Sequence, residues 1–201
     1  MIVFAKKVLF KLLSQKTYLR TLHRGFYFLY SLGILKNDER FKYHYMVKNL
    51  IEPTDTIVDI GANLGYFSKT FSRLVPEGKL VSIEPVKPFF DTLSYFIGSK
   101  PNVTIHNCAL GNEEGTITMV MPESNGMIRT GLPHIASSEE EKQAHKTHDV
   151  ALLKGSKLLG ELDKIDYIKC DIEGYEVVVF NELKSVIEKQ LYCHLRQPCF
   201  E

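Results

Sequence analysis

The sequence predicts an α/β fold built around a mostly parallel sheet. From residue 55 onward, short apolar runs typical of buried strands alternate with stretches that have helical periodicity. A turn that contains two glycines follows the first of these runs. Such alternation is typical of parallel strands joined by right-handed helical crossovers. The length of 201 residues suffices for one domain with a substantial core.

The first 54 residues are expected to form a basic helical extension. The first 50 residues contain ten lysines and arginines but only two acidic residues, and apolar side chains recur at helical spacing in MIVFAKKVLFKLL. Residues 1–30 therefore suit a helix packed over the sheet edge or the cofactor pocket, and they also suit a helix lying on an anionic membrane surface. We favour packing, which can coexist with peripheral membrane contact. No recognition motif accompanies the charge, so nucleic-acid binding is not expected.

Residues 55–201 are expected to form the α/β domain. Three strands with helices between them are predicted over 56–60, 65–74, 79–84, 87–97 and 103–109. A further strand and helix resume the pattern over 167–170 and 175–188.

Residues 111–155 are predicted to leave this sheet as an excursion. Strands are expected at its two ends, over 116–121 and 148–153, with a segment rich in Gly, Pro and Ser and a polar helix over 137–146 between them. Such departures from a sheet commonly select the substrate.

Cysteine usage indicates a protein of a reducing compartment, and hydropathy predicts no membrane span. The four cysteines form no CxxC pair and have no histidine at ligand spacing, so neither a zinc site nor a disulfide framework is expected. Lysines interrupt the N-terminal apolar stretch, and no apolar run reaches the ~18 residues of a membrane span. We expect a cytoplasmic protein, with any contact to the inner membrane surface peripheral.

The turn in VDIGANLGYFS has the character of a nucleotide-type ligand site. Asp59 ends a predicted strand, and Gly61 and Gly65 lie in the turn that opens a helix. Glycines there permit positive φ and let a ligand approach the backbone, and N–H groups at the helix start can meet polar ligand atoms. Glu84 ends the next strand, where a carboxylate can accept both hydroxyls of a ribose.

Two ligand classes use such a site, namely dinucleotides and S-adenosylmethionine. The dinucleotide fingerprint GxGxxG lacks its middle glycine here, which disfavours a nicotinamide oxidoreductase. A carboxylate such as Asp59 repels a pyrophosphate but attracts a sulfonium and an ammonium group. We therefore favour S-adenosylmethionine, while a purely structural glycine turn is the alternative.

Four ordered motifs resemble the FkbM-type methyltransferases, namely VDIGANLGYFS, VSIEP, NCALGNEEG and IDYIKCDIEGYE. The resemblance runs from about residue 55 to 183. It implies a class I, Rossmann-like enzyme that uses S-adenosylmethionine, often to methylate hydroxyls of sugars, glycans or natural products. It also implies that Asp171 lies beside the reacting methyl group and that the other cofactor contacts are Asp59, Gly61, Asn63, Gly65, Glu84, Ala109 and Leu110.

The carboxylates of IKCDIEGYE are the leading catalytic candidates. Asp171 directly follows the predicted strand, and Glu173 lies in the turn after it, where either could take a proton from an acceptor hydroxyl. His134 in the loop GMIRTGLPHIAS is a rival base, and Arg129 could bind an anionic acceptor. A metal-dependent mechanism has little support, because no further carboxylate cluster joins Asp171 and Glu173.

The end of the sequence departs from the family pattern. A class I methyltransferase sheet normally continues beyond its fourth strand, whereas the eleven residues after Gln190 could supply one more strand at best. We therefore expect a sheet without its last strands. The alternative function is a non-catalytic protein that binds S-adenosylmethionine or a partner, although the retained Asp59, Glu84 and Asp171 favour an enzyme.

Overall fold

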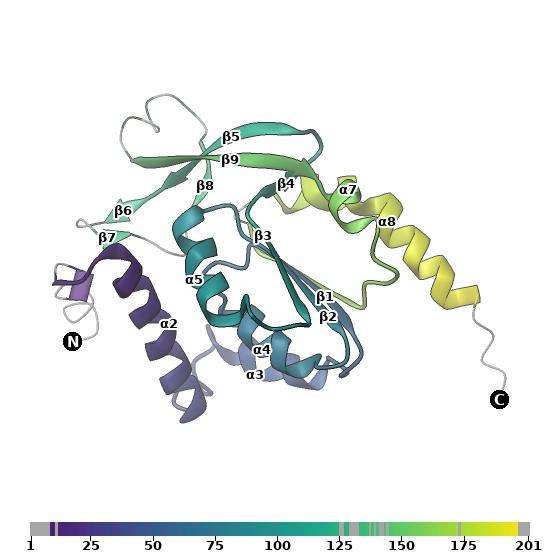
Figure 1. The fold of residues 1–201 in the computed structure, drawn as a ribbon, viewed down its shortest axis with the longest axis horizontal. Helices are drawn as coiled ribbons and strands as arrows, with labels where there is room; N and C mark the ends of the chain where they lie inside the picture. The colour runs from purple at the N-terminus through teal and green to yellow at the C-terminus, as the bar shows by residue number, and fades with distance from the viewer. Residues whose placement is uncertain are drawn as a thin grey trace.

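A four-stranded parallel sheet forms the centre of the computed structural model, which describes residues 9–10, 12–124, 127–128, 133–136, 138, 140, 143, 145–172 and 174–196 (Figure 1). The strand order across the sheet is β10-β1-β2-β3. The strands are β1 (Thr56–Ile60), β2 (Lys79–Ile83), β3 (Val103–His106) and β10 (Tyr167–Cys170). The predicted α/β fold with a parallel sheet is thereby confirmed.

The strand order reverses at β1. The chain proceeds outward from β1 to β2 and β3, and it later returns to pair β10 with the opposite edge of β1. In register, Ile60 lies between Ile83 on β2 and Cys170 on β10, so these three strands end side by side. Ligands of open α/β sheets bind at such a reversal, outside the carboxyl ends of the strands.

Helices cover both faces of this sheet. All five residues of β1 are buried, as expected for a parallel strand packed on two sides. One apolar cluster joins β1 and β2 to α4 (Tyr66–Leu74) and α5 (Lys87–Ile97) through Phe71 and Leu93. The opposite cluster includes Val179 and Leu183 of α8 (Glu176–Arg196).

The excursion folds as a second sheet with the strand order β4-β9-β5-β8. Its long arm is the antiparallel pair of β5 and β9 (Figure 1). The bounds are β4 (Ala109–Gly111), β5 (Gly115–Met121), β8 (His134–Ile135) and β9 (Lys146–Lys154), and a small pair is formed by β6 (Glu123–Ser124) and β7 (Met127–Ile128). A short helix, α7 (Gly155–Leu159), follows β9.

The prediction of one strand over 103–109 is wrong, because the chain changes sheets within it. The first sheet ends at His106, and Ala109 begins β4 of the second sheet. The side-chain amide of Asn107 donates to the carbonyls of Glu84 and Pro85, both at 2.8 Å, and fixes the bend between the two strands.

The N-terminal helix α2 (Gln15–Ser31) packs beside α4 and α5 (Figure 1). Its buried face includes Tyr18, Leu19 and His23, and His23 Nδ1 lies 2.9 Å from the carbonyl oxygen of Leu64 in the glycine turn. The packed form of the extension is thus confirmed for the described residues. A short helix α3 (Lys42–Met46) and a 3₁₀ turn η1 (Val47–Asn49) lead from α2 to the sheet.

Residues 191–196, which could at best have supplied one more strand, continue α8 instead. Their sequence LYCHLR contains no glycine or proline that would end a helix. The polar helix predicted over 137–146 falls largely outside the described residues. No helix among the described residues is long and apolar enough to span a membrane.

Candidate functional site

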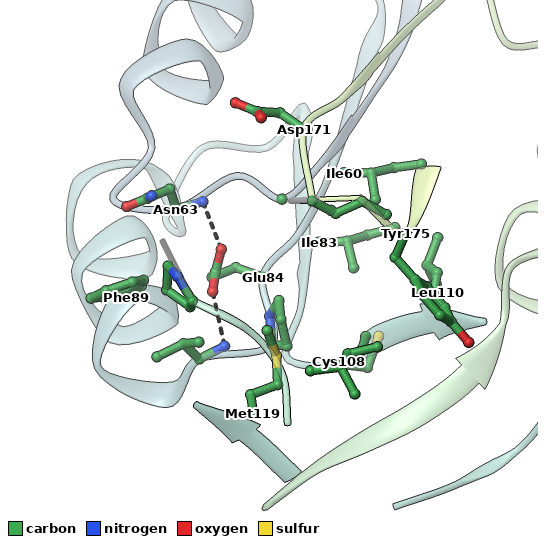
Figure 2. A pocket seen from close by; sticks show the side chains of 17 residues that line it. Ile60, Asn63, Ile83, Glu84, Phe89, Cys108, Leu110, Met119, Asp171 and Tyr175 are labelled. Carbon is green, nitrogen blue, oxygen red and sulfur yellow. Dashed lines mark hydrogen bonds between the residues drawn. The ribbon is translucent and has the colours of Figure 1, made fainter. Parts of the chain in front are cut away.

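A cavity opens where β1, β2 and β10 end (Figure 2). Its floor comes from the turn after β1, and one wall comes from the loop between β2 and α5. The second sheet contributes Met119 and Ile135, and the segment after β10 contributes Asp171 and Tyr175. The cavity therefore joins the strand ends of the first sheet to the excursion.

The turn after β1 shapes the cavity through left-handed backbone. Gly61 has a φ of +73° and Asn63 a φ of +53°. A Cβ atom on Gly61 would lie 2.1 Å from the carbonyl oxygen of Asp171, so only glycine lets this turn approach the end of β10.

The N–H groups of this turn are engaged within the protein. Those of Gly61 and Ala62 both donate to the carbonyl of Ile83, and that of Leu64 donates to the Asn63 side chain. These three N–H groups precede the start of α4, so the prediction that N–H groups at the helix start meet the ligand stays a prediction. The turn after β1 therefore contributes the shape of its left-handed backbone to the cavity.

Glu84 faces the cavity from the end of β2 (Figure 2). Its Oε2 accepts from the Asn63 N–H at 2.7 Å and its Oε1 from the Val86 N–H at 2.8 Å. The side chain is only 4% exposed, and this burial raises its pKa to about 7, although the two N–H donors act in the opposite direction. Each carboxylate oxygen retains a second lone pair, so the group can still accept from two hydroxyls.

Asp59 supports the cavity from behind instead of lining it. Its carboxylate is fully buried, accepts from the Ser68 hydroxyl at 2.6 Å, and lies 3.2 Å from the ammonium of Lys169. Gly65 is likewise absent from the lining and packs against Leu93 of α5. The predicted cofactor residues that line the cavity are Gly61, Asn63, Glu84, Ala109, Leu110 and Asp171.

Lys169 is the residue that the sequence analysis missed. Its ammonium lies 3.2 Å from Asp59 Oδ1, donates to the carbonyl of Gly61 at 3.2 Å, and is 3.9 Å from Asp171 Oδ2. The side chain is only 10% exposed. The signal was a lysine within the apolar strand YIKC, because a buried cation requires partners.

The predicted catalytic residues are placed differently from one another. Asp171 contributes to the lining of the cavity, and its side chain is 71% exposed. His134 is not part of the lining, although its neighbours Pro133 and Ile135 are, since successive side chains of a strand point to opposite faces. Glu173 and Arg129 lie outside the described residues.

Most of the remaining lining is apolar. Phe89, Cys108 and Met119 lie around Glu84 on different sides of the cavity (Figure 2). Apolar side chains beside a group that accepts from hydroxyls suit a ligand with a flat base attached to a ribose. No cluster of three or more His, Cys, Asp or Glu side chains suited to a metal occurs among the described residues.

Residues 59–195 match the model of the methyltransferase FkbM domain, which is more than half of the chain. The chain belongs to the FkbM methyltransferase family. This family depends on S-adenosylmethionine. The match covers both the turn after β1 and the segment after β10, the two parts of the cavity that the sequence motifs had indicated.

Two curated fungal proteins are similar to this FkbM-family chain. Methyltransferase 1 of Beauveria bassiana is 27% identical over 148 residues, which cover 65% of this chain and 59% of the relative. Methyltransferase sdnD of Sordaria araneosa is 28% identical over 160 residues, which cover 66% of this chain and 61% of the relative. The chain thus spans about three fifths of the length of these relatives.

Solved structures share local similarity with the FkbM-family chain. An S-adenosylmethionine-dependent methyltransferase from Aquifex aeolicus has a TM-score of 0.30 and 18% identity, covering 41% of this chain and 47% of its own. A second structure is that of phosphoethanolamine N-methyltransferase 1 of Haemonchus contortus, in complex with phosphoethanolamine and S-adenosylhomocysteine. It has a TM-score of 0.29 and 17% identity, and the match covers 45% of this chain and 21% of the Haemonchus chain. These similarities are too partial to bear on the ligands of this chain.

Proposed function

We propose that this chain transfers a methyl group from S-adenosylmethionine to a hydroxyl oxygen of a small-molecule or glycan acceptor. The observation that carries the proposal is the cavity at the reversal of strand order, which Glu84 and Asp171 both line (Figure 2). Membership of the FkbM family supports the methyl-transfer chemistry. The choice of oxygen rests on the solvent-exposed carboxylate of Asp171, which could take a proton from a hydroxyl.

The lining suits S-adenosylmethionine in charge and shape. Glu84 would accept from the two ribose hydroxyls, and the apolar side chains of Cys108, Leu110 and Met119 would contact the adenine. Asp171 supplies negative charge near the space left for the sulfonium. When bound, the cofactor supplies a methyl group activated by its cationic sulfur.

Asp171 is the general base in this proposal. A hydroxyl is a weak nucleophile at neutral pH, so a carboxylate that accepts its proton during methylation contributes roughly 10²–10⁴-fold to the rate. The high exposure of Asp171 leaves its oxygens accessible to an acceptor that enters from solvent. Glu173 and His134 are the alternative bases.

Lys169 holds the surrounding strand ends in place. Its ammonium connects the buried Asp59 on β1, the carbonyl of Gly61 and the carboxylate of Asp171. The two contacts at 3.2 Å hold the end of β10 against β1 and the glycine turn, and the ammonium attracts the exposed Asp171 carboxylate only weakly from 3.9 Å. Alignment of the acceptor with the methyl donor depends on such fixed geometry.

The proposal is tested by following S-adenosylhomocysteine release with a panel of sugars, glycans and other hydroxyl acceptors. We expect product only when an acceptor is present. At saturating S-adenosylmethionine, we expect Asp171→Asn to lower turnover at least about a hundredfold, with weaker cofactor binding as a separate and smaller effect of the lost charge. Full turnover by Asp171→Asn would exclude this residue as the base. A product methylated on nitrogen or carbon would overturn the assignment to oxygen.

A further inference from the structure

The outer face of α2 carries apolar side chains that the fold leaves in solvent. The inner face of this helix is already packed against α4 and α5, as described above. On the outside Phe28 is 64% exposed, and directly after the helix Leu32 is 58% and Ile34 60% exposed. None of these three side chains belongs to an apolar core cluster of the described residues, and exposed apolar side chains grouped in this way are typical of a contact surface.

Basic side chains accompany these apolar ones. Arg24 lies one helical turn before Phe28 on the same face. The Arg20 guanidinium lies 3.4 Å above the ring centre of the half-exposed Tyr95, and Arg24 donates to the hydroxyl of the same tyrosine at 3.2 Å. The surface thus combines guanidinium groups, an aromatic ring and aliphatic side chains.

The positive charge of this region is not neutralised within the described part of the chain. Arg20, Arg24 and the neighbouring Lys69 form no ion pair with a described carboxylate. The two acidic residues among the first 50 pair instead with Arg40 and Lys42. The pKa of Lys69 is lowered, first by burial and then by nearby cations that include Arg24, as expected where positive charges gather.

We propose that this surface docks the protein onto an anionic lipid bilayer. We define the α2 surface as Arg20, Arg24, Phe28, Leu32, Ile34 and Tyr95. Guanidinium groups suit anionic headgroups, while exposed apolar side chains can enter the boundary between headgroups and acyl chains. A second copy of the chain is a poorer partner, because a symmetric contact would place the same cations against one another.

In this proposal the two faces of α2 have different roles. Its inner face is part of the domain core and includes His23, which contacts the glycine turn at Leu64. Its outer face would lie on the membrane, so the domain would be held at the bilayer as one rigid unit. The inference stands apart from methyl transfer, because the α2 surface shares no residue with the cavity lining.

The test is co-sedimentation of the full chain with phosphatidylcholine vesicles that contain or lack phosphatidylglycerol. We expect binding only to the anionic vesicles, and we expect it to weaken as salt rises. Arg24→Gln should lower the partition coefficient roughly fivefold, which corresponds to about 1 kcal/mol per basic residue at the surface. Phe28→Ser combined with Leu32→Ser should lower it at least about tenfold.

A matched control removes an apolar and a basic side chain from another face. Val177→Ser combined with Lys184→Gln changes two exposed residues of α8 and should leave vesicle binding unchanged. All variants should keep the melting temperature and the affinity for S-adenosylmethionine of the wild type. The proposal is overturned if wild type fails to bind anionic vesicles, if it binds both vesicle types equally, or if the Phe28 and Leu32 variant binds as well as the control.

Discussion

Glu84 should make the affinity for S-adenosylmethionine depend on pH. Burial raises the pKa of its carboxyl to about 7, so the free protein carries a mixture of protonated and ionised Glu84 near neutrality. Ribose hydroxyls donate more strongly to the ionised form than to the neutral one. Binding should therefore favour ionised Glu84 and release a proton wherever the free carboxyl is protonated.

The size of the effect follows from the ionised fraction. With a pKa of about 7, roughly a tenth of the free protein has ionised Glu84 at pH 6 and roughly nine tenths at pH 8. The apparent Kd is inversely proportional to the fraction of protein that is competent to bind. We therefore expect Kd to fall about tenfold from pH 6 to pH 8, which corresponds to about 1.4 kcal/mol.

Calorimetric titration at pH 6, 7 and 8 measures this change directly. Repeating the titration at pH 7 in buffers with different ionisation enthalpies should show about half a proton released per bound ligand. Glu84→Gln keeps the size of the side chain but cannot ionise, so it should bind more weakly and with no pH dependence. The same tenfold change in Glu84→Gln, or a constant Kd in the wild type, would refute the role given to this carboxyl.

Three further predictions concern the support of the cavity. Gly61→Ala should lower the melting temperature and weaken cofactor binding, because its Cβ would lie 2.1 Å from the Asp171 carbonyl at a φ of +73°, and a melt identical to wild type would contradict this. Lys169→Met should lower the free energy of unfolding by about 3–5 kcal/mol by leaving the buried Asp59 charge unpaired. The double variant with Lys169→Met and Asp59→Asn should recover part of that lost free energy, as measured by urea unfolding. Additive losses from the two single variants would argue against an ion pair between Asp59 and Lys169. Burial lowers the pKa of His23 to about 4 in the folded protein. As the pH drops from 6.5 to 4, the unfolded chain therefore binds a proton at this histidine before the folded chain does, and the contribution of His23 to the free energy of unfolding should fall. His23→Phe should flatten that part of the pH profile of unfolding, whereas an unchanged slope would assign it to other groups.

The central sheet could be predicted from local sequence because each element has its own signals. The apolar run TIVDI predicted β1 with its observed bounds, and Pro88 and Gly98 mark the two ends of α5. The positions of Gly61 and Glu84 at the cavity also followed from the sequence, since parallel strands bring their carboxyl ends to one edge.

The remaining features depend on contacts between distant segments. The break between β3 and β4 lies in the apolar stretch VTIHNCALG, where the deciding interaction is that of Asn107 with carbonyls more than twenty positions earlier. Met119 and Ile135 reach the cavity only because the second sheet folds back over the strand ends. The role of Lys169 requires the neighbouring strand, which brings Asp59 to its ammonium.

The central claim is that the cavity lined by Glu84 binds S-adenosylmethionine. Calorimetric titration of the full chain tests this claim most directly, with Glu84→Ala and Glu77→Ala as a matched pair of variants. Glu77 is exposed in the turn before β2, so its removal should change nothing, whereas removal of Glu84 should weaken binding at least about tenfold. We expect one site per chain in the wild type and in Glu77→Ala. A folded wild type that binds no S-adenosylmethionine, or a Glu84→Ala variant that binds as tightly as Glu77→Ala, would contradict the assignment of the cavity.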